Sequence, residues 1–155
     1  MLITKESYDR LSNEYQDMIA NKRPYIVKKL EENRPFGCFN DSQTEYLQII
    51  DEQTQIEKRI SELSLILSQC QIYSEKKQCV DNNGNVIVGF GATVKIKDES
   101  ENIKKYKILS IYDSDINNGI ISIEAPIIKE MIDLQVGDFF EFRDKEYEIL
   151  SIEYI

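Results

Sequence analysis

Few side chains in this chain of 155 residues are suited to catalysis or metal binding. There is no histidine, which excludes imidazole acid–base catalysis and histidine-ligated metals. The three cysteines, Cys38, Cys70 and Cys79, are odd in number and form no C-x-x-C pair. They therefore argue against a disulfide framework and against a structural zinc site. Carboxylates remain as the side chains that could hold a cation.

The segment Gly89-Phe90-Gly91 could be mistaken for a phosphate-binding loop. That chemistry needs a further glycine, a lysine and the start of a helix, and this stretch supplies none of them. We therefore predict a bulge or a turn here.

The chain is acidic, with a formal net charge of −9. Phosphate contacts need clustered lysine and arginine, so free binding to nucleic acid along this surface would be repulsive. An acidic chain can still serve a nucleic-acid machine if its partner is a protein or if its carboxylates hold a metal. The sequence has no basic N-terminal region followed by an apolar core, and no run of about eighteen apolar residues. We expect a soluble cytoplasmic protein that does not associate with a membrane.

Residues 1–75 have the apolar spacing of two helices that pair as an antiparallel coiled coil. The first helix is expected to begin at Thr4 or Ser7, and Pro24 should kink or restart it. Its apolar seam consists of Tyr8, Leu11, Tyr15, Met18, Ile26, Val27 and Leu30.

Residues 34–41, which include Pro35 and Gly37, break this pattern. The second helix is expected from about Gln43 to Tyr73. Its seam consists of Tyr46, either Ile49 or Ile50, Gln53, Ile56, Ile60, Leu63, Leu67 and Cys70. The alternative is an ordinary helical hairpin that packs on its own domain.

A second domain is expected after a polar, turn-forming linker at 76–85. Residues 86–155 alternate short β-branched runs with turns of Gly, Asn and Asp. The expected strands lie at 86–96, broken by the glycine-rich kink, and at 106–111, 120–123, 139–142 and 147–152. Pro126 can open a short helix from Ile127 to Ile132. The predicted class is α+β, an antiparallel helical hairpin followed by an antiparallel sheet with one short helix.

Several segments carry a resemblance to a known family. Residues 88–94 read V-G-F-G-A-T-V, residues 119–127 read G-I-I-S-I-E-A-P-I, and V-G-D and Y-E-I-L follow at 136–138 and 147–150. In the hairpin, K-R-P stands at 22–24 and E-Y at 45–46. In order and spacing, over essentially the whole length, these segments resemble the Gre-type transcript cleavage factors, the bacterial GreA/GreB family that binds RNA polymerase.

The resemblance implies an FKBP-like C-terminal domain, without isomerase activity, that docks at the rim of the polymerase secondary channel. It also implies that the hairpin enters the channel and brings its tip to the polymerase active site. In the family, two acidic tip residues in the pattern G-D-L-x-E-N help hold a second Mg²⁺, with which the polymerase cleaves a backtracked RNA. The protein would then be an accessory factor rather than an enzyme, a monomer with no cofactor except a Mg²⁺ shared with the polymerase. It would meet the RNA 3′ end only indirectly.

The tip departs from the family pattern. Residues 37–42 read G-C-F-N-D-S, so Cys38 stands where the first acidic residue is expected, and Asp41 can replace the second. A thiol is a poor ligand for a hard cation, and a free thiol is mostly protonated at neutral pH. Two hypotheses stay open. Either the protein modulates or antagonises transcription without stimulating cleavage, which we favour, or Asp41, alone or with Glu45, supports cleavage. Asp41 and Ser42 can also simply cap the second helix.

Two further groups of residues have expected contacts with the polymerase. Phe36 and Phe39 flank the tip glycine and are expected to contact the channel wall, because exposed aromatic side chains usually need a partner surface. Glu124, Ala125, Pro126 and Ile127 stand where the family's polymerase-docking residues lie, with Glu124 and Ala125 replacing the family's Asn or Asp and its Ser. Without the family resemblance, the sequence indicates only that Pro126 begins a helix.

Two functions of other classes also remain. A stand-alone FKBP-like isomerase would leave the hairpin unexplained, and the sequence offers no aromatic-lined pocket for it. A coiled-coil adaptor would use its apolar seam to bind a partner helix.

Overall fold

The computed structural model describes residues 1–34, 42–73 and 78–154. They form two compact units, one of Tyr8–Cys70 and one that combines Met1–Ser7 with Gln71–Ile155. The unit boundaries therefore do not follow the expected division into 1–75, 76–85 and 86–155. The first residues of the chain belong with the sheet, and so does the stretch that begins at Gln71.

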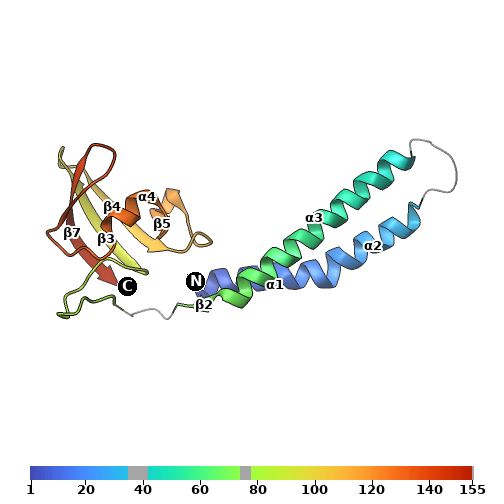
Figure 1. The fold of residues 1–155 in the computed structure, drawn as a ribbon, viewed down its shortest axis with the longest axis horizontal. Coiled ribbons are helices and arrows are strands. Elements are labelled where there is room, and N and C mark those ends of the chain that lie inside the picture. Colours follow the sequence, from blue (N-terminus) through green and yellow to red (C-terminus); the bar gives the residue numbers. More distant parts are fainter. Residues whose placement is uncertain (35–41, 74–77, 155) are drawn as a thin grey trace. The chain divides into compact units, whose positions relative to one another are not determined.

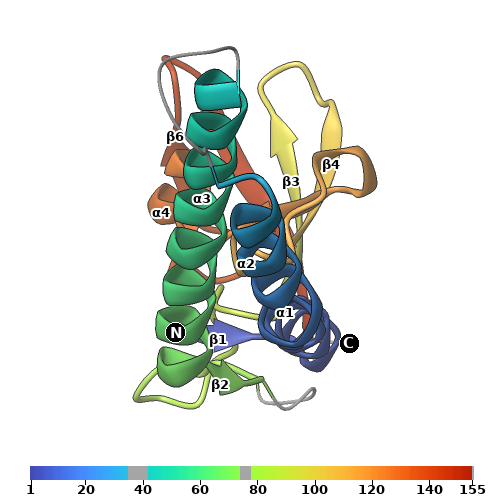
Figure 2. The same ribbon diagram turned by 90° about the vertical axis from the view of Figure 1, so that its right-hand side faces the viewer.

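The first unit is a helical hairpin, as predicted. Helix α1 (Lys5–Asp17), the π-helical turn η1 (Met18–Lys22) and α2 (Arg23–Glu32) form one arm, and α3 (Ser42–Gln69) forms the other. Both views of the ribbon show α2 running alongside α3 (Figures 1 and 2). The expected end of the second helix at Tyr73 is wrong, because the chain leaves the helix after Gln69 and becomes a strand.

The start of α1 and the break at Pro24 have clear local causes. Thr4 Oγ1 accepts the backbone N–H of Ser7 at 3.2 Å, so Thr4 caps the helix and Ser7 does not. Before Pro24, the N–H of Arg23 bonds to the carbonyl of Met18, five residues back. Proline has no N–H and cannot join an α-helical ladder, and the wide π turn lets α2 restart at this point.

The seam between the two arms contains most of the residues expected there. Its fully buried members are Leu11, Ile26, Ile49, Ile60 and Leu63. Of the two candidates in α3, Ile49 is buried and Ile50 is 38% exposed. The assignment of Val27 to the seam is wrong, since Val27 is 40% exposed and its neighbour Ile26 fills the position.

The second unit is built on a five-stranded sheet in the order β5-β4-β3-β7-β6. The strands are β3 (Ala92–Asp98), β4 (Ile103–Leu109), β5 (Ile120–Ser122), β6 (Phe139–Glu141) and β7 (Glu146–Tyr154). Three pairings are antiparallel, but β4 and β5 run parallel. The short 3₁₀ turn η2 (Ile116–Asn118) leads into β5, and α4 (Pro126–Met131) follows it (Figure 1).

The core of this unit lies between the inner face of the sheet and α4. Alternate residues of β3, Ala92, Val94 and Ile96, are fully buried, and so are Ile128 and Met131 of α4. Thus β3 and the helix are positioned as the alternating sequence pattern predicts. Residues 86–91 do not form the expected strand, because the backbone of Val88 bonds instead to Asp133 and Leu134.

A second, two-stranded sheet was not anticipated. Strand β1 (Leu2–Ile3) pairs in parallel with β2 (Gln71–Ile72). The N–H of Gln71 bonds to the carbonyl of Met1 at 2.9 Å, and the N–H of Tyr73 bonds to that of Ile3 at 2.7 Å. These bonds draw the end of the second arm out of the helix, and they bring the two ends of the hairpin segment together.

Candidate functional site

The segment expected to dock on the polymerase is a tightly turned junction between β5 and α4. Ser122 organises it, because its Oγ accepts the N–H of Glu124 at 3.1 Å and its carbonyl accepts the N–H of Ala125 at 2.9 Å. Ala125 is extended, and its carbonyl accepts the N–H groups of Ile128 and Lys129. Pro126 then enters the first turn of α4, where the missing N–H costs nothing.

The four predicted docking residues divide into exposed and anchoring side chains. Glu124 and Pro126 are exposed, whereas Ala125 and Ile127 are half-buried and pack against the core. The next residue, Ile128, is fully buried and fixes α4 to the sheet. The structure therefore exposes Glu124 and Pro126, while Ala125, Ile127 and Ile128 attach the segment to the core.

Most of the predicted tip site lies outside the described residues. Phe36, Cys38, Phe39 and Asp41 belong to this group, so their predicted roles stay predictions. Glu45 is described, and it lies exposed in the first turn of α3. Residues 1–34, 42–73 and 78–154 contain no cluster of three or more cysteine, aspartate or glutamate side chains that could hold a metal ion.

Ion pairs that sequence reasoning did not assign link the two arms of the hairpin. The pairs are Glu14 with Arg59, Glu57 with Arg23, and Glu52 with Lys29. Arg59 donates through Nε and Nη2 to both carboxylate oxygens of Glu14, at 2.7 and 2.9 Å. These hydrogen bonds hold the pKa of Glu14 below its ordinary value. Sequence spacing within one helix cannot reveal such pairs, because each partner lies on the other arm.

A polar network around Asp113 was also missed. Asp113 accepts hydrogen bonds from the hydroxyl groups of Thr4 and Ser110, and Thr4 is also the cap of α1. Burial raises the pKa of Asp113, but the hydrogen bonds from Ser110, Ser7 and Thr4 outweigh it and leave the pKa below its ordinary value. Asp113 lies between the strands predicted at 106–111 and 120–123, where a turn of Gly, Asn and Asp was expected, yet nothing local points to Thr4.

The glycine-rich segment is a turn, as predicted. The N–H of Ala92 bonds to the carbonyl of Gly89 at 3.1 Å, and Gly91 has a positive φ of 86°. A Cβ on Gly91 would lie 2.1 Å from the hydroxyl oxygen of Tyr73. The space that a glycine leaves here is thus filled by the protein's own tyrosine, which explains the residue type without a phosphate.

The part of the chain that the structure describes includes no helix that is both long and apolar enough to cross a membrane.

A helical hairpin and a separate sheet unit thus define a protein of two parts. Family models match both parts. Residues 1–72 match the N-terminal model of transcription elongation factors, and residues 83–154 match the C-terminal model of the transcription elongation factors GreA/GreB. The chain therefore belongs to the GreA/GreB family of transcription elongation factors.

Two GreA relatives agree with this assignment. The chain is 31% identical to transcription elongation factor GreA of Paracoccus denitrificans, over 99% of this chain and 97% of the relative. It is 34% identical to GreA of Buchnera aphidicola, over 99% and 96%. Among solved structures, GreA factor homolog 1 (Gfh1) of Thermus thermophilus matches with 23% identity and a TM-score of 0.44, over 99% of this chain and 98% of that one.

Proposed function

We propose that this protein binds bacterial RNA polymerase, inserts its hairpin into the secondary channel and modulates elongation and backtracking, with weak or no stimulation of transcript cleavage. Family membership supports the polymerase as the partner, and the relatives' names support an accessory role in elongation. The observation that carries the finer proposal is the sequence at the tip, where Cys38 replaces an expected carboxylate.

The donor set at the tip fits Mg²⁺ poorly. Asp41 offers one carboxylate and Cys38 offers a thiol, whereas Mg²⁺ prefers hard oxygen ligands in octahedral geometry. A second carboxylate would have to come from Glu45, one turn into α3. With fewer oxygen donors, the tip occupies the channel but does not hold a second metal firmly.

The hairpin has the length and the internal connections that such a role needs. Helix α3 has 28 residues, which gives a length of about 42 Å. Bidentate pairs at Glu14–Arg59 and Arg23–Glu57 fix the register between the arms. We propose that arms held in a fixed register determine how far the hairpin reaches into the secondary channel.

The second contact with the polymerase is assigned to residues 124–127 of the sheet unit. Glu124 and Pro126 are exposed on a support that Ile128 anchors in the core. We propose that they contact the rim of the channel, with Ala125 and Ile127 completing the surface.

The second candidate function is that of an active cleavage factor. It is favoured by the position of Glu45, which is exposed in the first turn of α3. In this case Asp41 and Glu45 together would hold the Mg²⁺ shared with the polymerase.

A cleavage assay on stalled, backtracked polymerase complexes separates the two functions. We expect little cleavage with the natural protein and clear stimulation with Cys38→Asp, because the variant restores a carboxylate. Gln48→Asp is the matched control, since it adds the same charge on an exposed face of α3. Cleavage by the natural protein that Cys38→Asp does not exceed, and that Asp41→Asn abolishes, would establish the second candidate instead.

Binding is tested separately by pull-down of purified polymerase. We expect Glu124→Lys to weaken capture and Glu130→Lys to leave it unchanged, because both side chains are exposed but only Glu124 lies in the docking segment. Equal capture by both variants would remove the docking segment from the proposal.

A further inference from the structure

One edge of the main sheet is left open beside a turn. Strand β5 pairs only with Lys107–Leu109 of β4, so within the described residues Ile103–Tyr106 forms an outer edge of the sheet. The N–H of Lys107 points to this edge, where it bonds to the carbonyl of Gly119 at 2.8 Å. Backbone direction alternates along a strand, so the N–H groups of Lys105 and Ile103 point to the same edge.

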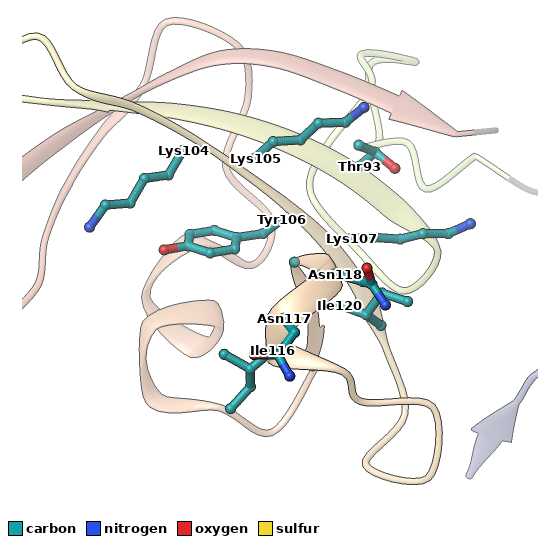
Figure 3. A pocket seen from close by; sticks show the side chains of 10 residues that line it. Thr93, Lys104, Lys105, Tyr106, Lys107, Ile116, Asn117, Asn118 and Ile120 are labelled. Atoms are coloured by element: carbon teal, nitrogen blue, oxygen red, sulfur yellow. The ribbon is translucent and has the colours of Figure 1, made fainter.

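A groove of about 720 Å³ lies along this edge. Its walls come from Lys104–Lys107 of β4 and from residues 116–120, the η2 turn and the start of β5. Figure 3 shows Lys104 and Tyr106 leaving one side of β4, and Lys105 and Lys107 leaving the other. A chain laid in the groove would therefore meet lysines on both of its faces.

The charge of the groove is opposite to that of the protein. Lys104, Lys105 and Lys107 line it in a chain whose net charge is −9. On the open face of the sheet, Lys95 lies directly opposite Lys105, and like charges in that position are destabilising. By register on that face, Glu153 lies opposite Thr93 on β7, two strands from Lys107. Asp115 lies opposite Ile120 beside the groove, but its carboxylate already accepts hydrogen bonds from Asn117 and Asn118.

One exposed aliphatic side chain lies in the lining of the groove, and another precedes the lining residues on β4. Ile116, in its lining, is 82% exposed, and Ile103, the first residue of β4, is 61% exposed. Exposed apolar groups next to unpaired backbone donors are typical of a strand edge that another chain can extend.

We infer that the groove beside β4 binds an extended, acidic segment of a partner protein, which adds to the sheet as a strand. Backbone pairing to Ile103 and Lys105 supplies the attachment, the lysines select carboxylate side chains, and Ile103 and Ile116 cover aliphatic ones. Lysines at a sheet edge disfavour pairing with a neutral strand, whereas their positive charges favour pairing with an acidic strand.

A protein segment fits these features better than a nucleic acid. The groove offers one aromatic side chain, Tyr106, which leaves β4 on the side away from Lys105 and Lys107, whereas nucleic-acid sites of this kind stack successive bases on several aromatic rings. The protein's net charge of −9 opposes binding of a long polyanion, whereas a short acidic segment in the groove lies closest to its three lysines.

The test uses a capped decapeptide of alternating glutamate and valine, titrated into the full chain and followed by NMR of backbone amides. We expect shifts and slowed hydrogen exchange at Ile103, Lys105 and residues 116–120. A glutamine-for-glutamate peptide and a peptide that is N-methylated at every residue should both bind about tenfold more weakly, because the first lacks charge and the second has no backbone N–H on either edge to pair as a strand.

Protein variants give the complementary test. The double variant Lys104→Glu with Lys105→Glu should weaken binding about tenfold. Its control is Lys129→Glu with Lys145→Glu, two exposed lysines outside the groove. Ile116→Ser is a second probe that does not disturb the core, and we expect about threefold weaker binding from it.

Three results would overturn the inference. One is the absence of shifts at these amides at millimolar peptide. Another is equal binding of the glutamine peptide or of the Lys104/Lys105 variant. The third is a duplex DNA that shifts the same amides with higher affinity than the acidic peptide.

Discussion

Replacing Asp113 with alanine should destabilise the sheet unit by about 3 kcal/mol. The carboxylate accepts hydrogen bonds from the hydroxyl groups of Thr4 and Ser110, and Ser110 is 3% exposed. A hydrogen bond to a charged group contributes about 1.5–3 kcal/mol, and a buried donor left without a partner costs about 1–3 kcal/mol. The network is only partly buried, so we take the lower end for each of the two bonds.

The conservative variant Asp113→Asn separates charge from shape. The asparagine amide can accept a hydrogen bond from one hydroxyl and donate one to the other, so we expect about half the loss of stability seen for Asp113→Ala. The assay is urea unfolding of the full chain, followed through amide NMR signals of β3 and β7, so that only the sheet unit is measured.

The same network predicts a dependence on pH. The pKa of Asp113 is lower in the folded state than its ordinary value of 3.8. Its contribution to stability is therefore complete above pH of about 4 and is lost as the pH falls through the folded pKa. Asp113→Asn should lose this part of the acid dependence.

Two outcomes would refute this account of Asp113. A loss below about 0.5 kcal/mol for Asp113→Ala would mean that the hydroxyls find other partners. An acid dependence unchanged in Asp113→Asn would mean that the carboxylate is not coupled to folding.

The remaining predictions concern packing in each unit. Leu63→Ala, at a fully buried seam position, should destabilise the hairpin by about 2–5 kcal/mol. Leu65→Ala, at a side chain that is 59% exposed, should cost less than about 1 kcal/mol. Hydrogen exchange along α3 measures both losses, and equal effects would contradict the assigned seam. Gly91→Ala should cost about 2–4 kcal/mol, because it combines a positive φ with displacement of the Tyr73 ring. Gly84→Ala has the same φ of 86° but open space, so about 1–2 kcal/mol is expected in the same urea assay, and a larger loss at Gly84 than at Gly91 would contradict the packing argument.

The helical part of the fold could be predicted because its signal is periodic and local. Residues at three- and four-residue steps identified the arms, and Pro24 identified the break. The sequence could not choose between Ile49 and Ile50, or exclude Val27, because adjacent apolar residues satisfy the same spacing. The choice depends on the register between the arms, to which the cross-arm pairs such as Glu14–Arg59 contribute.

The sheet was less predictable, since its pairings join residues far apart in the chain. The parallel contact of β4 with β5 depends on η2 and on Gly119, whose φ is 71°. Strands of two residues such as β1 and β2 are too short to show any alternation. Because β2 is too short to be recognised in the sequence, the second helix was predicted to continue to Tyr73, although it ends at Gln69.

The segment at residues 124–127 was proposed for docking from its motif, but the exposure of its side chains could only come from the fold. Pro126 predicted the start of α4. The hydrogen bonds around Ser122 determine that Glu124 is exposed while Ala125 is half-buried, and the sequence does not reveal them. Asp113 was missed, because its partner Thr4 lies 109 positions away.

The pairing of Leu2–Ile3 with Gln71–Ile72 has a consequence for protein engineering. It makes the helical segment an insert whose two ends sit at neighbouring points of one scaffold. Chimaeras that exchange this insert between relatives should therefore be joined near residues 7 and 71, and a fragment begun at residue 76 would lack both strands of the two-stranded sheet.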